Sequence, residues 1–312
     1  MIFRRDLRTT DNTALNLAVE HDPKENILPV FIFTPEQVTS KNSYRSTNAI
    51  NFMINSLKEI KHLQCFFGEN ISVLKHICSK VDVTSVFFNK DHTHYAKKRD
   101  TDIIEFCNKN DIKVHVTEDY NLNSIGTILT GAGTFYSTFT PYYRKAITQK
   151  VTKPDVKNNQ YGRLCLKPIK SEKSISLDDA KVKFTESASI RTTPTTTIVH
   201  GGRKEALNKL GQINDFKHYH NSRDTASIPT THLSAHIKFG TISIREAYFA
   251  FKSITDKNAS EALVRQLYWN DFYDQLMNGL PYERTLGKSN FKKLKIKWES
   301  PDHLQAWKDG KT

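Results

Sequence analysis

The sequence predicts an α/β domain built on a doubly wound parallel sheet, then a connector, then an all-α region. In the first 120 residues, short β-branched and aromatic segments alternate with helix-like segments, the pattern of strands buried on both faces. From about residue 150 this periodicity fades into a stretch rich in Lys, Ser and Thr, and after Gly201 only helical patterns follow. We therefore expect the α/β domain at 1–145, the connector at 146–198 and the helical region at 199–312.

The α/β domain is expected to contain strands that end at Phe3 and that cover 27–33, 65–67, 83–88 and 112–116. Helices are expected near 12–18, 50–60, 71–79 and 95–108. Apolar residues at a spacing of 3.6 identify the second of these helices: Ile50, Met53, Ile54, Leu57 and Ile60. Ligands of such sheets bind beyond the carboxyl ends of the strands, so a site is expected at that edge.

The helical region is expected to contain helices at 203–213, 233–239, 243–254 and 258–278. Together with the connector, it also carries most of the net positive charge of the chain. The 312 residues hold 46 Lys+Arg and 33 Asp+Glu, a net charge of +13, and residues 1–140 are balanced at 16 against 16. Residues 141–312 hold 30 against 17, which favours a polyanion such as nucleic acid as their partner. The alternative is a general enrichment of Lys in this chain.

Composition argues against several other classes of protein. No apolar run approaches the roughly 18 residues of a membrane span, and the N-terminus lacks the pattern of a signal peptide. We expect an intracellular protein that is neither secreted nor inserted in a membrane. The four cysteines are scattered, which is typical of reduced thiols, and no metal site is expected.

A loop before one predicted helix combines hydroxyl groups with free backbone N–H groups. Thr230, Thr231 and Ser234 surround the start of the helix at 233–239. Such a helix start can bind phosphate, although ordinary capping by Ser and Thr explains the same residues.

The helix at 258–278 carries polar and aromatic residues on one face. Gln266, Trp269, Asn270 and Tyr273 follow the spacing i, i+3, i+4 and i+7. Two amides, an indole and a phenol suit the wall of a pocket that stacks on a flat ring and hydrogen-bonds its edge. Burial of the two aromatic residues in a core is the alternative.

Motifs in a fixed order along the whole chain resemble those of the DNA photolyase/cryptochrome family. They are FRRDLR at 3–8 with DN at 11–12, FTPYY at 139–143, LSAHIKFGTISIR at 233–245, QLYWNDFY at 266–273 and HLQAWKDGKT at 303–312. The chain most resembles the class I, bacterial-type cyclobutane pyrimidine dimer photolyases. The resemblance implies light-driven repair of DNA that contains pyrimidine dimers, by electron transfer from reduced FAD.

The resemblance also assigns roles to residues of this chain. It implies that FAD is bound by Tyr219, Thr230, Thr231, His232, Leu233 and Ser234. It implies that Arg223 contacts the DNA backbone and that Gln266, Trp269, Asn270 and Tyr273 line the lesion pocket, with Trp269 stacked on the flipped-out dimer. No residue is assigned as catalytic.

Some positions depart from the family pattern. Gln266 stands where dimer photolyases have Glu, which resembles (6-4) photolyases and animal cryptochromes. Asn270 replaces an Arg, and Tyr95-Ala96 stand where bacterial relatives have an Asn-Glu pair that holds folate, so an antenna chromophore of folate or deazaflavin type is left open.

The chain ends at Thr312, where the family continues into a further helical stretch. We expect a C-terminally truncated chain with an incomplete FAD-binding domain, whose enzyme activity alone is in doubt and whose partner is a separately encoded C-terminal fragment. A non-repairing, cryptochrome-like or degenerate DNA-binding protein is the first alternative. A doubly wound nucleotide-binding domain of an unrelated enzyme is the second.

Overall fold

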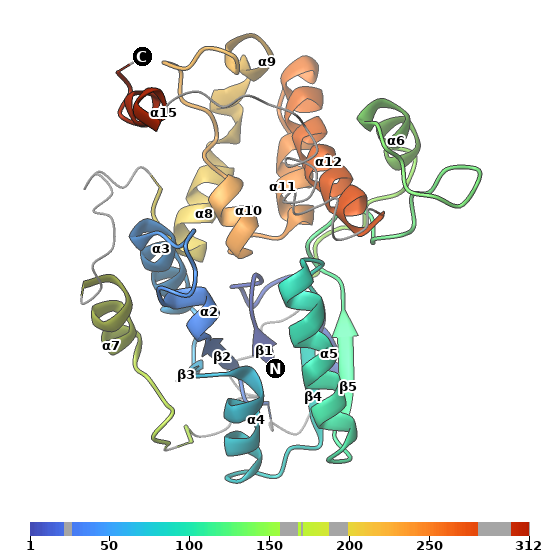
Figure 1. Ribbon diagram of the computed structural model, residues 1–312. Coiled ribbons are helices and arrows are strands. Elements are labelled where there is room, and N and C mark those ends of the chain that lie inside the picture. The colour runs from blue at the N-terminus through green and yellow to red at the C-terminus, as the bar shows by residue number, and fades with distance from the viewer. Residues whose placement is uncertain (22–26, 157–167, 170, 187–198, 280–300, 312) are drawn as a thin grey trace.

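The fold is described from a computed structural model that covers residues 1–21, 27–156, 168–169, 171–186, 199–279 and 301–311. Its lower half in Figure 1 contains the strands, and its upper half is built from helices. The chain therefore has the predicted α/β part followed by a helical part.

The five expected strands are present, and every pairing between them is parallel. Strands β1 (Ile2–Phe3), β2 (Val30–Phe33) and β3 (Gln64–Phe67) form one sheet in the order β1-β2-β3. Strands β4 (Ser85–Asn89) and β5 (Lys113–Thr117) form a second pair, and β4 contacts β1. The prediction of a doubly wound parallel sheet is confirmed.

Helices cover this sheet as the alternating pattern predicts. They are α1 (Thr13–His21), α2 (Pro35–Val38), α3 (Thr47–Leu57), α4 (Asn70–Cys78) and α5 (His94–Asn108). The stripe that identified α3 faces inward, because Ile50, Met53, Ile54 and Leu57 are all buried. The single turn of α2 was not predicted, since four residues carry no periodicity.

The connector contains a short helix that the sequence analysis did not predict. Helix α7 (Leu177–Lys181) continues into a π-helical turn (Val182–Glu186) and packs against α3. Ala180 and Phe184 are buried in the core of the α/β part. Two apolar residues four positions apart are too few to show a helical period in sequence.

The helical part is formed by elements from both sides of the connector. They are α6 (Phe139–Ala146), α8 (Arg203–Gly211), the 3₁₀ turn η3 (Ile213–Phe216), α9 (Tyr219–Ser222), α10 (Ser234–Phe239), α11 (Ile244–Lys252), α12 (Lys257–Gly279) and α15 (Pro301–Lys308). Helix α6 was expected to close the α/β domain, but its Phe139, Tyr142 and Ala146 are buried in the helical core. Among the described residues, no helix is both long and apolar enough to cross a membrane.

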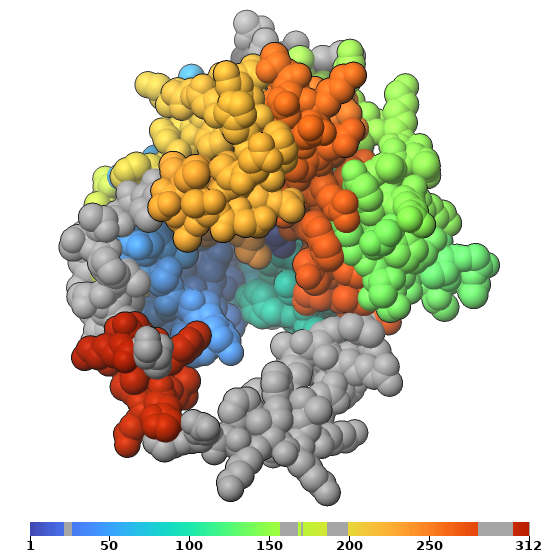
Figure 2. Space-filling view, turned by 90° about the horizontal axis from the view of Figure 1, so that it is seen from above, coloured from blue at the N-terminus to red at the C-terminus, as the bar shows by residue number. Residues whose placement is uncertain are grey.

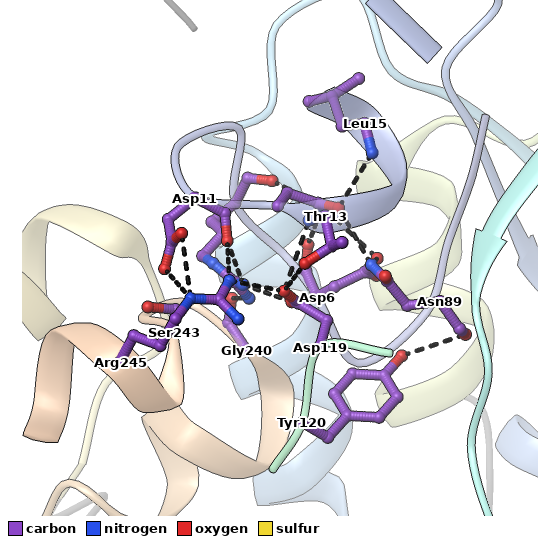
Figure 3. A network of polar contacts seen from close by, with 12 residues as sticks. Asp6, Asp11, Thr13, Leu15, Asn89, Asp119, Tyr120, Gly240, Ser243 and Arg245 are labelled. Carbon is purple, nitrogen blue, oxygen red and sulfur yellow. Dashed lines mark hydrogen bonds and ion pairs between the residues drawn. The ribbon is translucent and has the colours of Figure 1, made fainter. Parts of the chain in front are cut away.

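A buried network of charged groups fixes the two parts against each other (Figure 3). The Asp119 carboxylate, which follows β5, accepts hydrogen bonds from Arg8 and from Arg245 of α11, the latter at 2.9 Å. Arg245 also pairs with Asp11 at 2.9 Å. Arg8 and Asp119 have almost no exposed side-chain surface, so this ion pair is shielded from water.

Candidate cofactor site between the two parts

A cavity of about 390 Å³ lies where the helical part meets the carboxyl ends of the strands. It is lined by Arg5, Tyr120, Tyr219, Thr230, Thr231, His232, Leu233, Ser234, Ile237, Lys238, Phe251, Leu263, Gln266, Leu267 and Asn270. Figure 2 shows a hollow bordered by the yellow and orange surfaces of the helical part and by blue and teal surfaces of the α/β part. Its position agrees with the rule for parallel sheets.

The loop at 230–234 contributes hydroxyl groups to this cavity. Leu233 is buried in the helical core and anchors the loop, and His232 adopts a left-handed backbone conformation with φ of 50°. Helix α10 begins after Leu233 without any side-chain cap. The hydroxyl of Ser234 is therefore not used as a helix cap, whereas the Thr231 hydroxyl accepts a hydrogen bond from the backbone N–H of Leu233 at 3.4 Å.

The cavity wall is positively charged. Among the described lining residues, Arg5 and Lys238 are the ionised side chains, and no carboxylate is present. Burial lowers the pKa of Lys238, and the neighbouring charge of Arg5 lowers it further. Arg5 is also paired with Asp91, which lies outside this lining, at 3.0 Å. The two cations, next to several hydroxyls, form a site suited to an anionic ligand such as a phosphate.

Helix α12 presents only part of its predicted face to the cavity. Gln266 and Asn270 line it. Trp269 instead stacks on Phe139 of α6, with ring centroids 3.6 Å apart and an interplanar angle of 6°, and Tyr273 stacks on Trp269 at 5.6 Å. The helix thus divides its amides and its aromatic rings between the cavity and a separate aromatic stack.

The two remaining predicted residues lie on α9 and at its end. Tyr219 lines the cavity, and burial raises the pKa of its phenol. Arg223 is exposed outside the cavity lining, with Asp224 as a weak neighbour at 3.6 Å. Arg223 is thus free to meet a ligand at the surface but not one inside the cavity.

Three lining residues with polar side chains were missed by the sequence analysis: Arg5, Tyr120 and Lys238. The Arg5 guanidinium lies 4.9 Å from the centroid of the Tyr120 ring, and its Nε donates to the Lys238 carbonyl at 3.2 Å. Arg5 and Tyr120 each follow a strand of the sheet by a few residues. That position, at the carboxyl ends of parallel strands, was the signal that could have identified them.

Helix α12 also holds the segment that carries Tyr120. The buried carboxylate of Asp271 accepts hydrogen bonds from the backbone N–H groups of Leu122 at 3.0 Å and Asn123 at 2.9 Å. Gln275, one turn later, accepts from the N–H of Gly126 at 2.9 Å. Tyr120 therefore has a fixed place in the cavity wall.

A second cavity, of about 500 Å³, opens at the ends of β1 and β2. Its charged lining residues are Arg4, Arg5, Glu36, Lys41, Asp91 and Arg99. Arg4 and Arg99 both hydrogen-bond to Asp100, yet each keeps a buried Nη2 atom without a hydrogen-bond partner. Buried guanidinium nitrogens of this kind can donate hydrogen bonds to an anion.

Comparisons with known proteins agree on one family. The model of the family described as DNA photolyase matches residues 1–158. The deoxyribodipyrimidine photo-lyase of Halobacterium salinarum is 28% identical over 99% of this chain and 67% of its own. The (6-4)DNA photolyase of Arabidopsis thaliana is 26% identical over 99% of this chain and 60% of its own.

Solved structures give the same result. An archaeal photolyase from Sulfolobus tokodaii, described with two FAD molecules, is 31% identical with a TM-score of 0.72, covering 100% of this chain and 66% of that one. A Synechocystis cryptochrome shares the fold, with a TM-score of 0.78 at 15% identity over 99% of this chain and 67% of that one. The chain spans about two thirds of the length of these relatives.

Proposed function

The chain belongs to the DNA photolyase family, and we propose that it acts in light-dependent repair of pyrimidine dimers in DNA, with FAD in the cavity between its two parts. The observation that carries the proposal is the wall of that cavity, where described cations and hydroxyls occur without a carboxylate. A dinucleotide with a pyrophosphate group matches this wall in charge and in hydrogen bonding. The volume of 390 Å³ lies within the usual range for ligand sites, about 300–1,000 Å³.

Each wall of the cavity has a role in this proposal. Arg5 and Lys238 face the phosphates, and the hydroxyls of Thr230, Thr231 and Ser234 donate hydrogen bonds to phosphate oxygens. Tyr219, His232 and Leu233 complete that side and exclude water. FAD, when bound in its reduced form, supplies the light-driven electron.

In this proposal the DNA lesion contacts helix α12. Gln266 and Asn270 present amides that can hydrogen-bond the polar edges of a pyrimidine dimer. Tyr273 is 56% exposed at the end of the aromatic stack and offers a flat surface to a displaced base, with Trp269 stacked behind it. Arg223 and the basic half of the chain would bind the DNA backbone.

The class of lesion rests on Gln266. An amide cannot donate a proton as a carboxylic acid can, which favours the (6-4) photoproduct over the cyclobutane dimer as the substrate. Both classes occur among the relatives of this chain, the Halobacterium salinarum deoxyribodipyrimidine photo-lyase and the Arabidopsis (6-4)DNA photolyase, so both lesions are tested below.

The cavity at the strand ends is proposed to hold an antenna chromophore. Its anionic group would lie against the unpaired Nη2 atoms of Arg4 and Arg99, with Tyr44 and Tyr95 as aromatic neighbours. Folate and deazaflavin types both satisfy this chemistry.

A repair assay tests the proposal. The purified chain is loaded with FAD, mixed with oligonucleotides that hold one cyclobutane dimer or one (6-4) photoproduct, and illuminated with blue light, with a dark control. The assay is repeated with a polypeptide that supplies the remaining third of the Halobacterium salinarum relative, because the chain spans only 67% of that protein. Loss of the lesion only in the light is the expected result. FAD binding without repair in either mixture would support the non-repairing, cryptochrome-like alternative.

A further inference from the structure

Arg5 lies between the two cavities. The interdomain cavity is the one of about 390 Å³ between the two parts of the chain, and the strand-end cavity is the one of about 500 Å³ at the ends of β1 and β2. It comes directly after β1 and Arg4, and it is the only residue of the described chain that lines both cavities. Its Nη1 donates to Asp91, in the wall of the strand-end cavity, at 3.0 Å. Its Nε donates to the Lys238 carbonyl, and its guanidinium covers the ring of Tyr120, both in the wall of the interdomain cavity. One cation thus forms the partition between two sites.

Asp91 is the counterion of Arg5 on one side of this partition. Burial would raise the pKa of the Asp91 carboxyl, but the charge and hydrogen bond of Arg5 overcome this and lower it to about 2. Asp91 is therefore a carboxylate at neutral pH. The Nη2 atom of Arg5 donates to no described residue, so it can meet a ligand.

We propose that Arg5 couples the two cavities, so that an anionic ligand bound in one lowers the affinity of the other for a second anion. This rests on the proposed function, in which the phosphates of FAD occupy the interdomain cavity. An anion there attracts Arg5 away from Asp91 and leaves that carboxylate in the wall of the strand-end cavity with the backbone N–H groups of His92 and Thr93 as its remaining described hydrogen-bond donors. The exposed negative charge then repels an anion on that side.

The coupling is reciprocal, because a change in one binding equilibrium that depends on the other must act in both directions. Coupling between sites commonly changes affinity by roughly 5–150-fold. Because backbone N–H groups also stabilise the Asp91 carboxylate, we expect the lower end, about fivefold.

The test uses the purified chain, FAD, and FMN as an anionic aromatic probe of the strand-end cavity. The Kd of FAD is measured by isothermal titration at increasing FMN concentrations. Coupling predicts that the apparent Kd rises about fivefold and then reaches a plateau. If FAD and FMN instead competed for one shared site, the apparent Kd of FAD would rise in proportion to the FMN concentration without a plateau. That result would contradict the proposal. Absence of any FMN binding also overturns it.

Variants separate this coupling from general damage. Arg5→Met and Asp91→Asn should each reduce the plateau to less than twofold, since both remove the ion pair. Arg99→Met is the matched control, because this cation lines the strand-end cavity and does not line the interdomain cavity. It should weaken FMN binding while the plateau persists at higher FMN concentrations. If the wild-type chain binds no FAD at all, the proposed function fails. If FAD binds and FMN binds without changing its Kd, only the coupling fails.

Discussion

His236 is a fully buried imidazole at the contact between α10 and α3. Its Nδ1 lies 2.9 Å from the Thr241 hydroxyl, its Nε2 has no hydrogen-bond partner, and the ring of Phe52 packs at 5.0 Å. Burial, and to a smaller extent the charge of Lys209, lowers the pKa of His236 to about 4. An unfolded chain binds a proton at this residue near pH 6.5, so it holds more protons than the native state between pH 6.5 and 4.

We therefore expect the free energy of unfolding to decrease as the pH falls from 6.5 to 4, by roughly 3 kcal/mol from this residue. Urea denaturation at several pH values measures the change. His236→Gln should reduce the dependence of the free energy of unfolding on pH between 6.5 and 4, since an amide does not titrate. His218→Gln is the control, because His218 is exposed and should leave the curve as it is. A wild-type curve that is already flat would contradict the prediction.

Gln266 is the residue on which the class of lesion depends. It lines the interdomain cavity from α12, and a carboxyl at this place could donate a proton to the dimer. In a chain that shows any repair, Gln266→Glu should increase repair of cyclobutane dimers by about tenfold or more, in line with general acid catalysis. Light-dependent turnover of the two lesion types measures the change. Lower repair of both types would count against the role given to Gln266.

Gly240 ends α10 and joins it to the α/β part. It has φ of 67°, and a Cβ at this position would lie 2.0 Å from the Arg5 carbonyl oxygen. The segment at 5–8 fills the end of the helix, since Leu7 donates to the Phe239 carbonyl at 3.1 Å and Arg8 to the Gly240 carbonyl at 3.2 Å. The last carbonyls of α10 are thus satisfied by another part of the chain.

Gly240→Ala should consequently lower the free energy of unfolding by at least about 2 kcal/mol, through the left-handed conformation and the clash with backbone. Gly211→Ala, at the end of α8, is the matched control, because nothing lies within 4 Å of its Cβ position. It should leave the free energy of unfolding unchanged or raise it by up to about 1 kcal/mol, because Ala favours the helix over Gly. Thermal denaturation of both variants measures the change in the free energy of unfolding. An equal decrease in the two variants would show that the close contact at Gly240 has no effect on stability.

Elements with long periodic patterns could be predicted from sequence, and elements without them could not. Helix α3 was identified by its apolar stripe, whereas α7 and α2 are too short to show a period. On α12 the helical spacing grouped Trp269 with Gln266, but it could not show that Phe139, 130 positions earlier, would stack on the indole. The spacing of residues in the sequence shows which side chains share a face of a helix, but it does not show which other residues pack against that face.

The site itself depends on contacts across the whole molecule. The loop at 230–234 and the amides of α12 were predicted because they lie within short motifs of the helical region. Arg5 and Tyr120 line the same cavity only because the strand ends of the α/β part point toward the helical region. Arg5 and Lys238, which are in contact, are more than 200 residues apart in the sequence. Such a contact leaves no periodic signal in the sequence, which is why both residues were missed.

At the scale of the whole molecule, Asp119 joins the two parts of the chain that form the walls of the interdomain cavity. Its buried carboxylate compensates Arg8 and Arg245 and accepts from the Thr13 hydroxyl at 2.7 Å, so it ties α1, α11 and the β1–α1 loop together. Asp119→Asn would leave Arg8 buried without a full countercharge. Removal of one partner from such a pair costs about 3–5 kcal/mol.

We expect Asp119→Asn to lower the free energy of unfolding by that amount and to weaken FAD binding, because the two walls of the cavity come from the two parts that Asp119 holds together. Asp102→Asn, which removes an exposed pair with Lys98 on α5, should cost less than about 1 kcal/mol and leave FAD binding unchanged. Chemical denaturation and FAD titration of both variants measure the difference. A stable Asp119→Asn chain with wild-type affinity for FAD would show that the helical part keeps its place without this ion pair, through apolar packing alone.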